Sequence, residues 1–487
     1  MQTITLAMSV DDIIGKVQDA VWGWPLIILI LAAGVWLTVR TGFVQVRHLG
    51  KALKFMVKNE DNGEGEVTSF GALCTALSAT IGTGNIVGVA TAICLGGPGA
   101  LLWMLLAAFF GMATKYSEGF LAIKYREKKD DSHYLGGPFY YIEKGMGTKW
   151  KWLAKLFAVF GICVGLFGIG TFTQINGIAT AVQDFFDPKS AHVAFTLFGN
   201  DYTWATVIGG LVVTLCVALV VLGGIQRIAK VSQVIVPFMA ITYVVFALII
   251  VLGHITAIPA AVKLICKSAF DPQAALGAAT GVTIKLAMQK GIGRGIFSNE
   301  AGLGSAPIAA AAAKTKDTVR QGLVTMTGTF IDTIVICTLT GLSIVVTGAQ
   351  NAFVAGSVEG VKITSRAWQT GLPWNGRFSA FVLMVCLAFF AFTTILGWNY
   401  YSERCLEYLV GSQKFTKVYR YLYILAVFIG PYLTVAAVWN IADICNGLMA
   451  FPNLIALFAL SGVVGKETRA YFAEKRHDLK AMAQDKK

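Results

Sequence analysis

The hydrophobic pattern of the chain consists of long apolar runs separated by short polar segments. About eleven runs have the length of roughly 20 residues that lets a helix cross a hydrocarbon core about 30 Å thick. No polar segment is long enough to form a separate soluble domain. We therefore predict an all-α polytopic membrane protein with about 11 transmembrane helices, in the runs 21–39, 70–95, 100–121, 153–182, 203–224, 229–253, 276–312, 321–347, 378–400, 419–440 and 446–464.

Composition supports this prediction, because 56% of the 487 residues are hydrophobic, only 14% are charged and the mean hydropathy is +0.66. The formal net charge of +13 calls for no nucleic acid partner, since the basic residues cluster in alternate loops. Those loops hold about 28 of the 40 Lys and Arg residues, which predicts an outside N-terminus and a cytoplasmic C-terminus. The nine cysteines are scattered, so we expect neither disulfides nor a transition-metal site.

Two of the runs are interrupted by glycines near their middles. One contains SATIGTGNIVG at 78–88, and the other, about 210 residues later, contains GIGRGIFSNEAGLGSAP at 291–307. With the first run set aside, the other ten divide into two sets of five, each beginning with an interrupted run. Five spans per set make the second set inverted relative to the first. The predicted division is an N-terminal extra helix with the first cytoplasmic loop (1–69), a first repeat (70–254), an inverted second repeat (255–464) and a charged cytoplasmic tail (465–487).

Paired interruptions of this kind indicate the binding site of a secondary transporter. Unwound backbone at membrane depth is costly unless it lines a cavity or lies within protein. Free amides at a half-helix attract a carboxylate, and unwound carbonyls suit sodium or an ammonium group, so a zwitterionic amino acid fits both. The alternative for such glycines is close helix packing. GTGNIVG lacks the βαβ context of a nucleotide site, and no Walker A pattern occurs, so we expect no nucleotide cofactor.

Three segments carry a resemblance to a known family: ALSATIGTGNIVGVATAICLGGPGALLWM, KGIGRGIFSNEAGLGSAPIAAAAAKT and AFTTILGWNYYSER. Together they resemble the alanine/glycine:cation symporter family over nearly the whole chain. The resemblance implies a LeuT-type 5+5 inverted repeat, with a discontinuous first helix in each repeat and one extra N-terminal helix. It also implies sodium-driven uptake of alanine or glycine across the plasma membrane (bacterial inner membrane), with D-alanine as a further candidate substrate. Beyond these solutes and the lipid bilayer, no obligate protein partner is evident.

The resemblance places the substrate between the first and sixth core helices. By alignment of GTGN, Gly84 resembles the glycine whose amide meets the substrate carboxylate, and Thr80 would turn a carbonyl toward the amine. Thr83 and Asn85 are the side chains best able to add hydrogen bonds there, and Gln174 is a buried amide in an apolar run. Further substrate-site candidates, with helix packing as the alternative, are Phe297 and Trp398.

The sodium site of LeuT-type symporters joins carbonyls of the first core helix to hydroxyls of the eighth. The run 378–400 corresponds to that eighth helix and carries adjacent hydroxyls. An all-oxygen shell suits a hard cation, although a membrane threonine commonly bonds its own helix. The predicted sodium ligands are Ser78, Ile81, Phe390, Thr393 and Thr394.

Charged residues within apolar runs are functional candidates. We assign Arg294 and Glu300 a gating or structural role, in which Glu300 pairs with Arg294 or caps a half-helix beginning near Asn299. Asp332 is expected to pair with a lysine of the second interrupted run. If the coupling ion were a proton, Glu300 or Asp332 would carry it. An ion channel is the alternative from another class, and no enzyme motif occurs in the runs.

Overall fold

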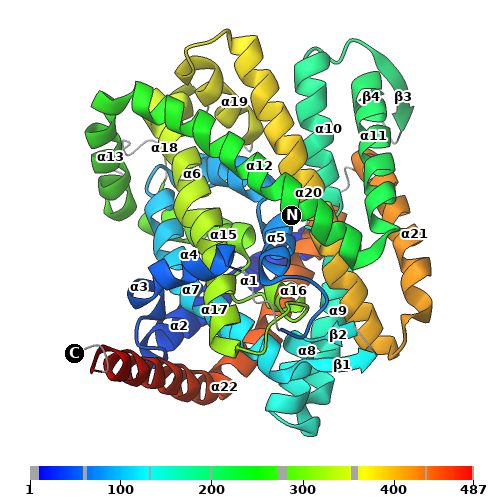
Figure 1. Cartoon of the computed structure of the whole chain (residues 1–487). Helices are drawn as coiled ribbons and strands as arrows, with labels where there is room; N and C mark the ends of the chain where they lie inside the picture. Colours follow the sequence, from blue (N-terminus) through cyan, green and yellow to red (C-terminus); the bar gives the residue numbers. More distant parts are fainter. Residues whose placement is uncertain are drawn as a thin grey trace, which may run out of the picture.

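The computed structural model describes residues 10–58, 63–130, 133–197, 200–271, 282–352, 360–433 and 436–484 and is built mainly of helices (Figure 1). The elements of the first half are α1 (Val10–Val21), α2 (Trp24–Arg40), α3 (Val44–Arg47), α4 (Leu49–Val57), α5 (Ser69–Thr80), η1 (Gly84–Gly88), α6 (Val89–Gly96), α7 (Ala100–Tyr125), β1 (Glu127–Asp130), β2 (His133–Leu135), α8 (Pro138–Tyr140), η2 (Tyr141–Gly145), η3 (Thr148–Trp150), α9 (Lys151–Phe167), α10 (Phe172–Phe186), β3 (Val193–Leu197), β4 (Asn200–Thr203), α11 (Trp204–Val221) and α12 (Gly224–Gly253).

The second half begins with two short elements and contains the second interrupted run. Its elements are η4 (Ile255–Ala257), α13 (Ile258–Phe270), α15 (Ile284–Asn299), α16 (Ala306–Ala310), α17 (Thr318–Thr329), η6 (Phe330–Cys337), α18 (Thr338–Thr347), η7 (Ala349–Ala352), α19 (Gly360–Gly371), α20 (Gly376–Val410), η8 (Gln413–Phe415), α21 (Thr416–Ile429), η9 (Gly430–Tyr432) and α22 (Ala436–Gln484).

Eight helices in the described part of the chain are long and apolar enough to cross a membrane, and a bent pair makes nine. The expectation of a polytopic all-α protein is therefore confirmed, whereas the count of eleven is not established. Two of the predicted runs account for the difference. The run 276–312 contains α15, which has 16 residues, and the run 419–440 contains α21, which has 14. The division into two inverted repeats stays a prediction at the level of its residue boundaries.

The first predicted interruption is present. Helix α5 ends at Thr80, Ile81 is extended, and a wide-turned helix, η1, resumes at Gly84. The two parts form the bent pair, at an angle of 51°. Thr68 caps the start of α5 by accepting a hydrogen bond from the Gly71 amide at 3.0 Å.

The second interruption is also present, but it begins later than the glycines suggest. GIGRG, at 291–295, lies within α15, which ends at Asn299. Glu300 follows in the left-handed conformation at φ 55°, and helix resumes only at Ala306. Glu300 therefore ends the first half-helix, so the expectation that a half-helix begins near Asn299 with Glu300 as its cap is wrong.

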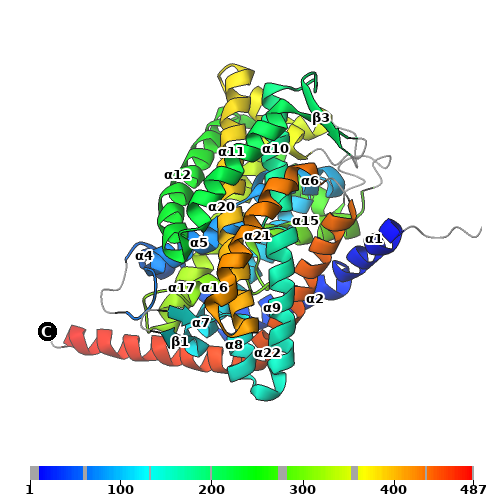
Figure 2. The same ribbon diagram turned by 90° about the vertical axis from the view of Figure 1, so that its right-hand side faces the viewer.

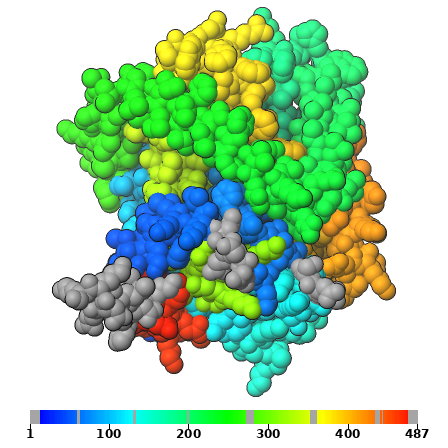
Figure 3. Space-filling model, viewed as in Figure 1, coloured from blue at the N-terminus to red at the C-terminus, as the bar shows by residue number. Residues whose placement is uncertain are grey.

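The molecule has two distinct ends, which we name by their elements. The tail face carries β1, α8 and the C-terminal part of α22, which runs across the base of the other helices (Figure 2). The hairpin face carries β3, β4, α13 and α19 at the opposite end (Figure 1). Helix α12 covers much of the face seen in Figure 3, above the central helices. Both interruptions thus lie between the two ends, inside the helix bundle.

Candidate functional site

A cavity of about 420 Å³ lies beside the first interruption. Thr83, Gly84 and Phe297, three of the predicted substrate residues, line it, as does the predicted gating residue Arg294. The other lining residues in the described part of the chain are Val87, Gly88, Thr91, Thr173, Asn176, Gly177, Thr180, Val361 and Asp443. Since Val361 belongs to α19, the cavity extends from the interruption toward the hairpin face.

Gly84 lies where the two interrupted helices approach each other. A side chain there would place its Cβ 3.2 Å from the Cα of Ser298 and 3.4 Å from the ring of Phe297. A glycine leaves the backbone accessible at such a close approach. This geometry agrees with the predicted use of the Gly84 amide, because an amino acid in the cavity can reach the main chain.

Asn85 does not line the cavity and instead holds the first interruption to η6, between α17 and α18. Its amide nitrogen donates to Oδ1 of Asp332 at 2.7 Å, and its amide oxygen accepts from the Gly82 amide at 2.9 Å. Asp332 also accepts from the hydroxyl of Ser298 at 2.9 Å and that of Thr333 at 2.7 Å. The expected pairing of Asp332 with a lysine of the second interrupted run is wrong, because its carboxylate is occupied by these neutral donors. One buried carboxylate thereby joins both interrupted helices.

Gln174 and Thr80 also act on protein rather than lining the cavity. The Gln174 side-chain oxygen accepts from the Thr83 amide at 3.2 Å, and its nitrogen donates to the Ile169 carbonyl at 3.0 Å. The Thr80 hydroxyl donates to carbonyls of its own helix, at Ala76 and Leu77. Gln174 therefore supports unwound backbone next to the cavity, which is a positioning role in this conformation.

The predicted sodium ligands meet where α20 passes the end of α5. The Thr394 hydroxyl lies 3.0 Å from the carbonyl of Phe390 and 3.4 Å from that of Ile81. The Thr393 hydroxyl shares the Phe390 carbonyl at 3.0 Å and otherwise approaches the sulfur of Met239 on α12, at 3.5 Å. Thr394 is thus the residue of the pair that reaches the interrupted helix.

Ser78 completes this region from α5. Its hydroxyl donates to the Thr75 carbonyl at 2.7 Å. A Cβ added to Gly397 of α20 would lie 2.8 Å from the same hydroxyl oxygen, so the two helices touch here. Carbonyl and hydroxyl oxygens from both helices are therefore close together in a buried position, as an oxygen-coordinated cation requires.

Glu300 ties the second interruption to α20. Its carboxylate accepts from the indole of Trp398 at 2.8 Å and from the Ser305 hydroxyl at 2.5 Å. Arg294 does not pair with it, because the Arg294 guanidinium lies over the ring of Phe297 at 5.6 Å. Trp398 is 1% exposed and is absent from the described cavity lining. In this conformation Trp398 therefore does not line the cavity, although it was a substrate-site candidate.

Sequence reasoning missed Asp443, which lines the cavity from α22. Its carboxylate accepts from the side-chain amide of Gln18 in α1 at 2.8 Å. Arg294 and Asp443 line both this cavity and an adjacent one of about 100 Å³. The signal was an acidic residue at the edge of an apolar run, which is a functional candidate in a membrane protein.

Lys115 and Glu118 are three residues apart in α7, a spacing that suits a simple ion pair at the membrane interface, but the structure places both inside the protein. Both side chains are almost fully buried. Glu118 accepts from the Asn453 side chain at 2.7 Å and from the Gly302 amide at 3.2 Å. Glu118 thus supports the unwound backbone after α15, instead of forming a simple surface pair.

A cluster of charged side chains closes the tail face below the sodium-ligand region. Arg404 donates to Glu407 at 2.8 Å and to Glu66 at 3.2 Å. His133 lies 2.7 Å from Glu407 and 3.3 Å from Glu66. Partial burial lowers the pKa of His133, but the bonds to the two carboxylates outweigh it and raise the pKa to about 9. The cluster therefore ties β2, the entry to α5 and the end of α20 together through a protonated histidine.

The sequence comparisons identify the family to which these features belong. The model of the sodium:alanine symporter family matches residues 7–486. The chain belongs to the sodium:alanine symporter family. An uncharacterized transporter of Haemophilus influenzae is 52% identical over 465 residues, covering 96% of this chain and 97% of that protein. The sodium/alanine symporter AgcS of Methanococcus maripaludis is 45% identical over 477 residues, covering 97% of this chain and all of that protein.

A solved structure confirms the LeuT-type fold of this sodium:alanine symporter family member. The transporter MhsT in complex with L-phenylalanine matches with a TM-score of 0.52, covering 84% of this chain and 99% of that chain. At 11% identity, this likeness concerns the fold alone. The family and its relatives are transporters, so the expectation that the protein is not an enzyme is confirmed. It is a multi-pass membrane transporter.

Proposed function

We propose that the protein is a sodium-coupled symporter that carries alanine, glycine and similar small neutral amino acids into the cytoplasm. The observation that carries this proposal is the pairing of two sites at one interruption. A cavity reaches the backbone at Gly84, and oxygens from α5 and α20 gather a short distance away along the chain at Ile81. A substrate and a cation at the same unwound segment influence each other through the backbone they share.

The substrate class follows from the lining of the cavity. Thr83, Gly84 and Gly88 present backbone and one small hydroxyl, and Phe297 supplies an apolar wall. Main-chain amides where a helix resumes favour a carboxylate, and the Gly84 amide is the proposed donor, since the Gly82 and Thr83 amides already donate to Asn85 and Gln174. Glycines leave little bulk to fill the space, and an aromatic wall favours a short apolar side chain. The name of the Methanococcus maripaludis relative supports alanine.

Sodium is the proposed coupling ion because the donor set is neutral and made of oxygen. The carbonyls of Ser78, Ile81 and Phe390 with the hydroxyls of Thr393 and Thr394 suit a hard monovalent cation better than a proton, since no carboxylate stands among them. Thr394 is the member that already spans the two helices, at 3.4 Å from the Ile81 carbonyl. Sodium would replace that long contact with two coordination bonds.

Alternating access then needs a gate on each side of the cavity. Toward the hairpin face, Arg294 and Asp443 lie on opposite helices of the lining, and we propose that they close over bound substrate. Toward the tail face, the cluster of Arg404 with Glu66 and Glu407 is closed in this conformation. By the basic-loop pattern, the hairpin face is outside, in the plasma membrane of a bacterium.

Uptake by liposomes that contain only this protein tests the proposal. Labelled alanine should accumulate under an inward sodium gradient, not with potassium on both sides, and excess glycine should suppress it. Asp443→Asn should impair accumulation, whereas Lys263→Gln, an exposed charge on α13, should not. Alanine accumulation that needs no sodium would overturn the proposed coupling ion. No alanine accumulation under any ion gradient would overturn the proposed substrate.

Proton coupling is the second candidate, favoured by one observation. Glu300 and Asp332 are buried carboxylates that contact the two interruptions, where a change of protonation would alter the contacts of both. Alanine uptake that ignores sodium but stops with a proton uncoupler, and is lost in Asp332→Asn, would establish it. Membership in a symporter family favours either form of coupled transport over the channel alternative.

A further inference from the structure

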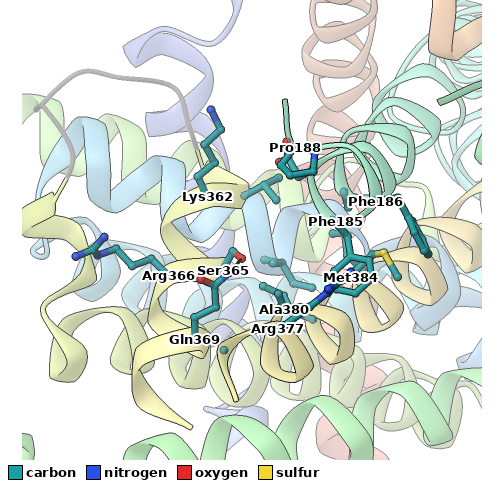
Figure 4. A pocket seen from close by; sticks show the side chains of 17 residues that line it. Phe185, Phe186, Pro188, Lys362, Ser365, Arg366, Gln369, Arg377, Ala380 and Met384 are labelled. Carbon is teal, nitrogen blue, oxygen red and sulfur yellow. Dashed lines mark hydrogen bonds between the residues drawn. The ribbon is translucent and has the colours of Figure 1, made fainter. Parts of the chain in front are cut away.

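A second, larger cavity lies apart from the transport site, near the hairpin face (Figure 4). Its volume is about 760 Å³, and it is walled by the end of α10, by α19 and by the beginning of α20. Its apolar floor includes Ala181, Leu383 and Leu387. Val361 lines both this cavity and the substrate cavity, so the two are neighbours across α19.

The cavity has two chemically different edges. Lys362, Arg366 and Gln369 extend from α19 at one edge, whereas Phe185, Phe186 and Met384 lie at the other (Figure 4). Arg377 comes from α20, and its guanidinium lies 5.9 Å from the ring centre of Phe185. A ligand that fills the cavity must therefore be apolar at one end and polar at the other.

The polar edge favours an anion. Within the described part of the chain, Arg366 and Arg377 have no ion pair, and Asp184 is the acidic residue of the lining. Arginine binds phosphate with two parallel hydrogen bonds and is weakly hydrated compared with lysine. Gly376, the first residue of α20, also borders the cavity, and the start of a helix attracts negative charge, although the Arg377 amide already donates to the side-chain oxygen of Asn375 at 2.8 Å.

The position of the cavity favours a lipid over a soluble anion. Helix α10 ends at Phe186 and α20 begins at Gly376, so the cavity lies at the level where two membrane-crossing helices stop. Large exposed aromatic side chains occur at these helix ends: Phe186, which lines the cavity, is 63% exposed, and Trp374 and Phe378, beside the start of α20 in sequence, are 45% and 48% exposed. Such residues gather at the boundary between hydrocarbon and headgroups.

Three basic residues at this place also depart from the charge pattern of the chain. Most Lys and Arg lie in the loops of the tail face, and the opposite loops hold about seven. Arginine side chains form strong hydrogen bonds with phosphate groups such as those of lipid headgroups. We propose that this cavity binds one anionic phospholipid, with its headgroup held by the basic side chains of α19 and α20 and an acyl chain along Phe186 and Met384.

A bound lipid here would reach the transport machinery. Ile86 of the first interruption forms part of the floor, and its carbonyl accepts from the Thr364 hydroxyl of α19 at 3.1 Å. A Cβ on Gly360 of α19 would lie 2.5 Å from the Val87 carbonyl, so α19 lies directly against the interrupted helix. The lipid would hold α19 between α10 and α20 and so stabilise one position of α19 against the first interrupted helix.

The test is lipid binding by the purified full chain in detergent, followed by native mass spectrometry and by the melting temperature. Dioleoyl phosphatidylglycerol should bind with defined stoichiometry and raise the melting temperature, and dioleoyl phosphatidylcholine should not. Each removed cation near a membrane surface weakens anionic-lipid binding about fivefold, so Arg366→Gln with Arg377→Gln should weaken it about thirtyfold. The matched pair Lys263→Gln with Lys285→Gln removes two exposed charges elsewhere and should stay within about twofold.

A second variant tests the space rather than the charge. Ala380→Trp fills the cavity from α20 and should abolish the lipid peak while the protein without lipid keeps its melting temperature within a few degrees. Equal losses in both double variants would show attraction without a site and overturn the proposal. Unchanged binding in Arg366→Gln with Arg377→Gln would do the same. Stabilisation by inorganic phosphate alone, to the same extent as by the lipid, would replace the lipid with a soluble anion. Because binding is measured without transport, failure of the proposed function would leave these outcomes unaffected.

Discussion

Gly82 permits the close contact between the first interruption and α20, and replacing it gives the sharpest test of the sodium site. A Cβ at Gly82 would lie 2.5 Å from the hydroxyl oxygen of Thr394 and 3.1 Å from the side-chain oxygen of Gln174. Ordinary contact begins at 3.4 Å, so the hydroxyl must move by 3.4 − 2.5 = 0.9 Å. It can do so only by leaving the Ile81 carbonyl, which it approaches to 3.4 Å.

We expect Gly82→Ala to raise the sodium concentration for half-maximal alanine uptake by about tenfold or more. Overpacking of a filled interior costs about 1–3 kcal/mol, and a free energy of that size changes an affinity about 5- to 150-fold. Sodium titrations of uptake in liposomes measure the shift, and thermal unfolding without sodium measures the structural cost separately.

Gly293→Ala is the matched control in the second interrupted run. No atom lies within 4 Å of the added Cβ, and the residue is inside helix α15. Alanine there should stabilise the protein by about 0.5–1 kcal/mol, because glycine disfavours helix. Replacing glycine with alanine should therefore destabilise the protein at Gly82 and stabilise it at Gly293.

The outcome that refutes this reasoning is a Gly82→Ala protein with unchanged sodium dependence. If Gly82→Ala fails to fold, combining it with Thr394→Ala removes the collision. The double variant should then regain stability but keep a weak sodium response. Recovery of both would show that the Thr394 hydroxyl is not a ligand.

Four further predictions concern single side chains. Thr394→Ala should raise half-saturating sodium in liposome uptake more than Thr393→Ala, because only the former hydroxyl reaches the interrupted helix. Asp332→Asn should lower the free energy of unfolding by about 2–3 kcal/mol, since it turns a carboxylate with three donors into an amide; an unchanged denaturation midpoint would contradict this. Because the pKa of His133 rises from 6.5 to about 9, its contribution, about 3 kcal/mol before and about 2 kcal/mol after allowance for solvent screening of this partly exposed group, is complete below pH 6.5 and is lost as pH rises through 9. Melting temperatures of the protein and His133→Gln should therefore differ at pH 6 and converge above pH 9. Trp398→Phe removes a bond to a buried carboxylate and should cost about 2 kcal/mol, visible as a lower melting temperature.

The existence of both interruptions could be predicted from sequence, because glycine and a buried amide in an apolar run need a reason. The exact start of the second break could not be predicted. Glycines at 291–295 lie within helix, where Gly291 and Gly295 allow contact with Ala100 and Met104 of α7. The unwinding begins instead at Glu300, a residue that seldom takes the left-handed conformation. Packing, which sequence spacing does not contain, decides between these uses of glycine.

The roles of the polar residues were harder to predict than their importance. Asn85 and Gln174 were expected to meet substrate, and both instead bond the protein. The reason is distance along the chain, because the partner of Asn85 lies 247 residues away. A sequence reveals that a buried amide needs partners, but a partner from another helix is known only once the helices are packed. Of the predicted sodium ligands, Thr394 and Ile81 lie close together in the structure, and their role as ligands stays a prediction.

The carboxylate of Asp332 has a mechanical consequence. Since it accepts hydrogen bonds from Asn85 of one interrupted helix and from Ser298 of the other, the two interrupted helices are expected to move together as one unit. Opening toward the tail face is then expected as a movement of this unit relative to α20, where the Thr394 hydroxyl lies 3.4 Å from the Ile81 carbonyl. A cation bound between the two interrupted helices and α20 would hold them together, and its release to the cytoplasm would let them separate. The bound ion would thus determine whether two rigid units of the protein can move relative to each other.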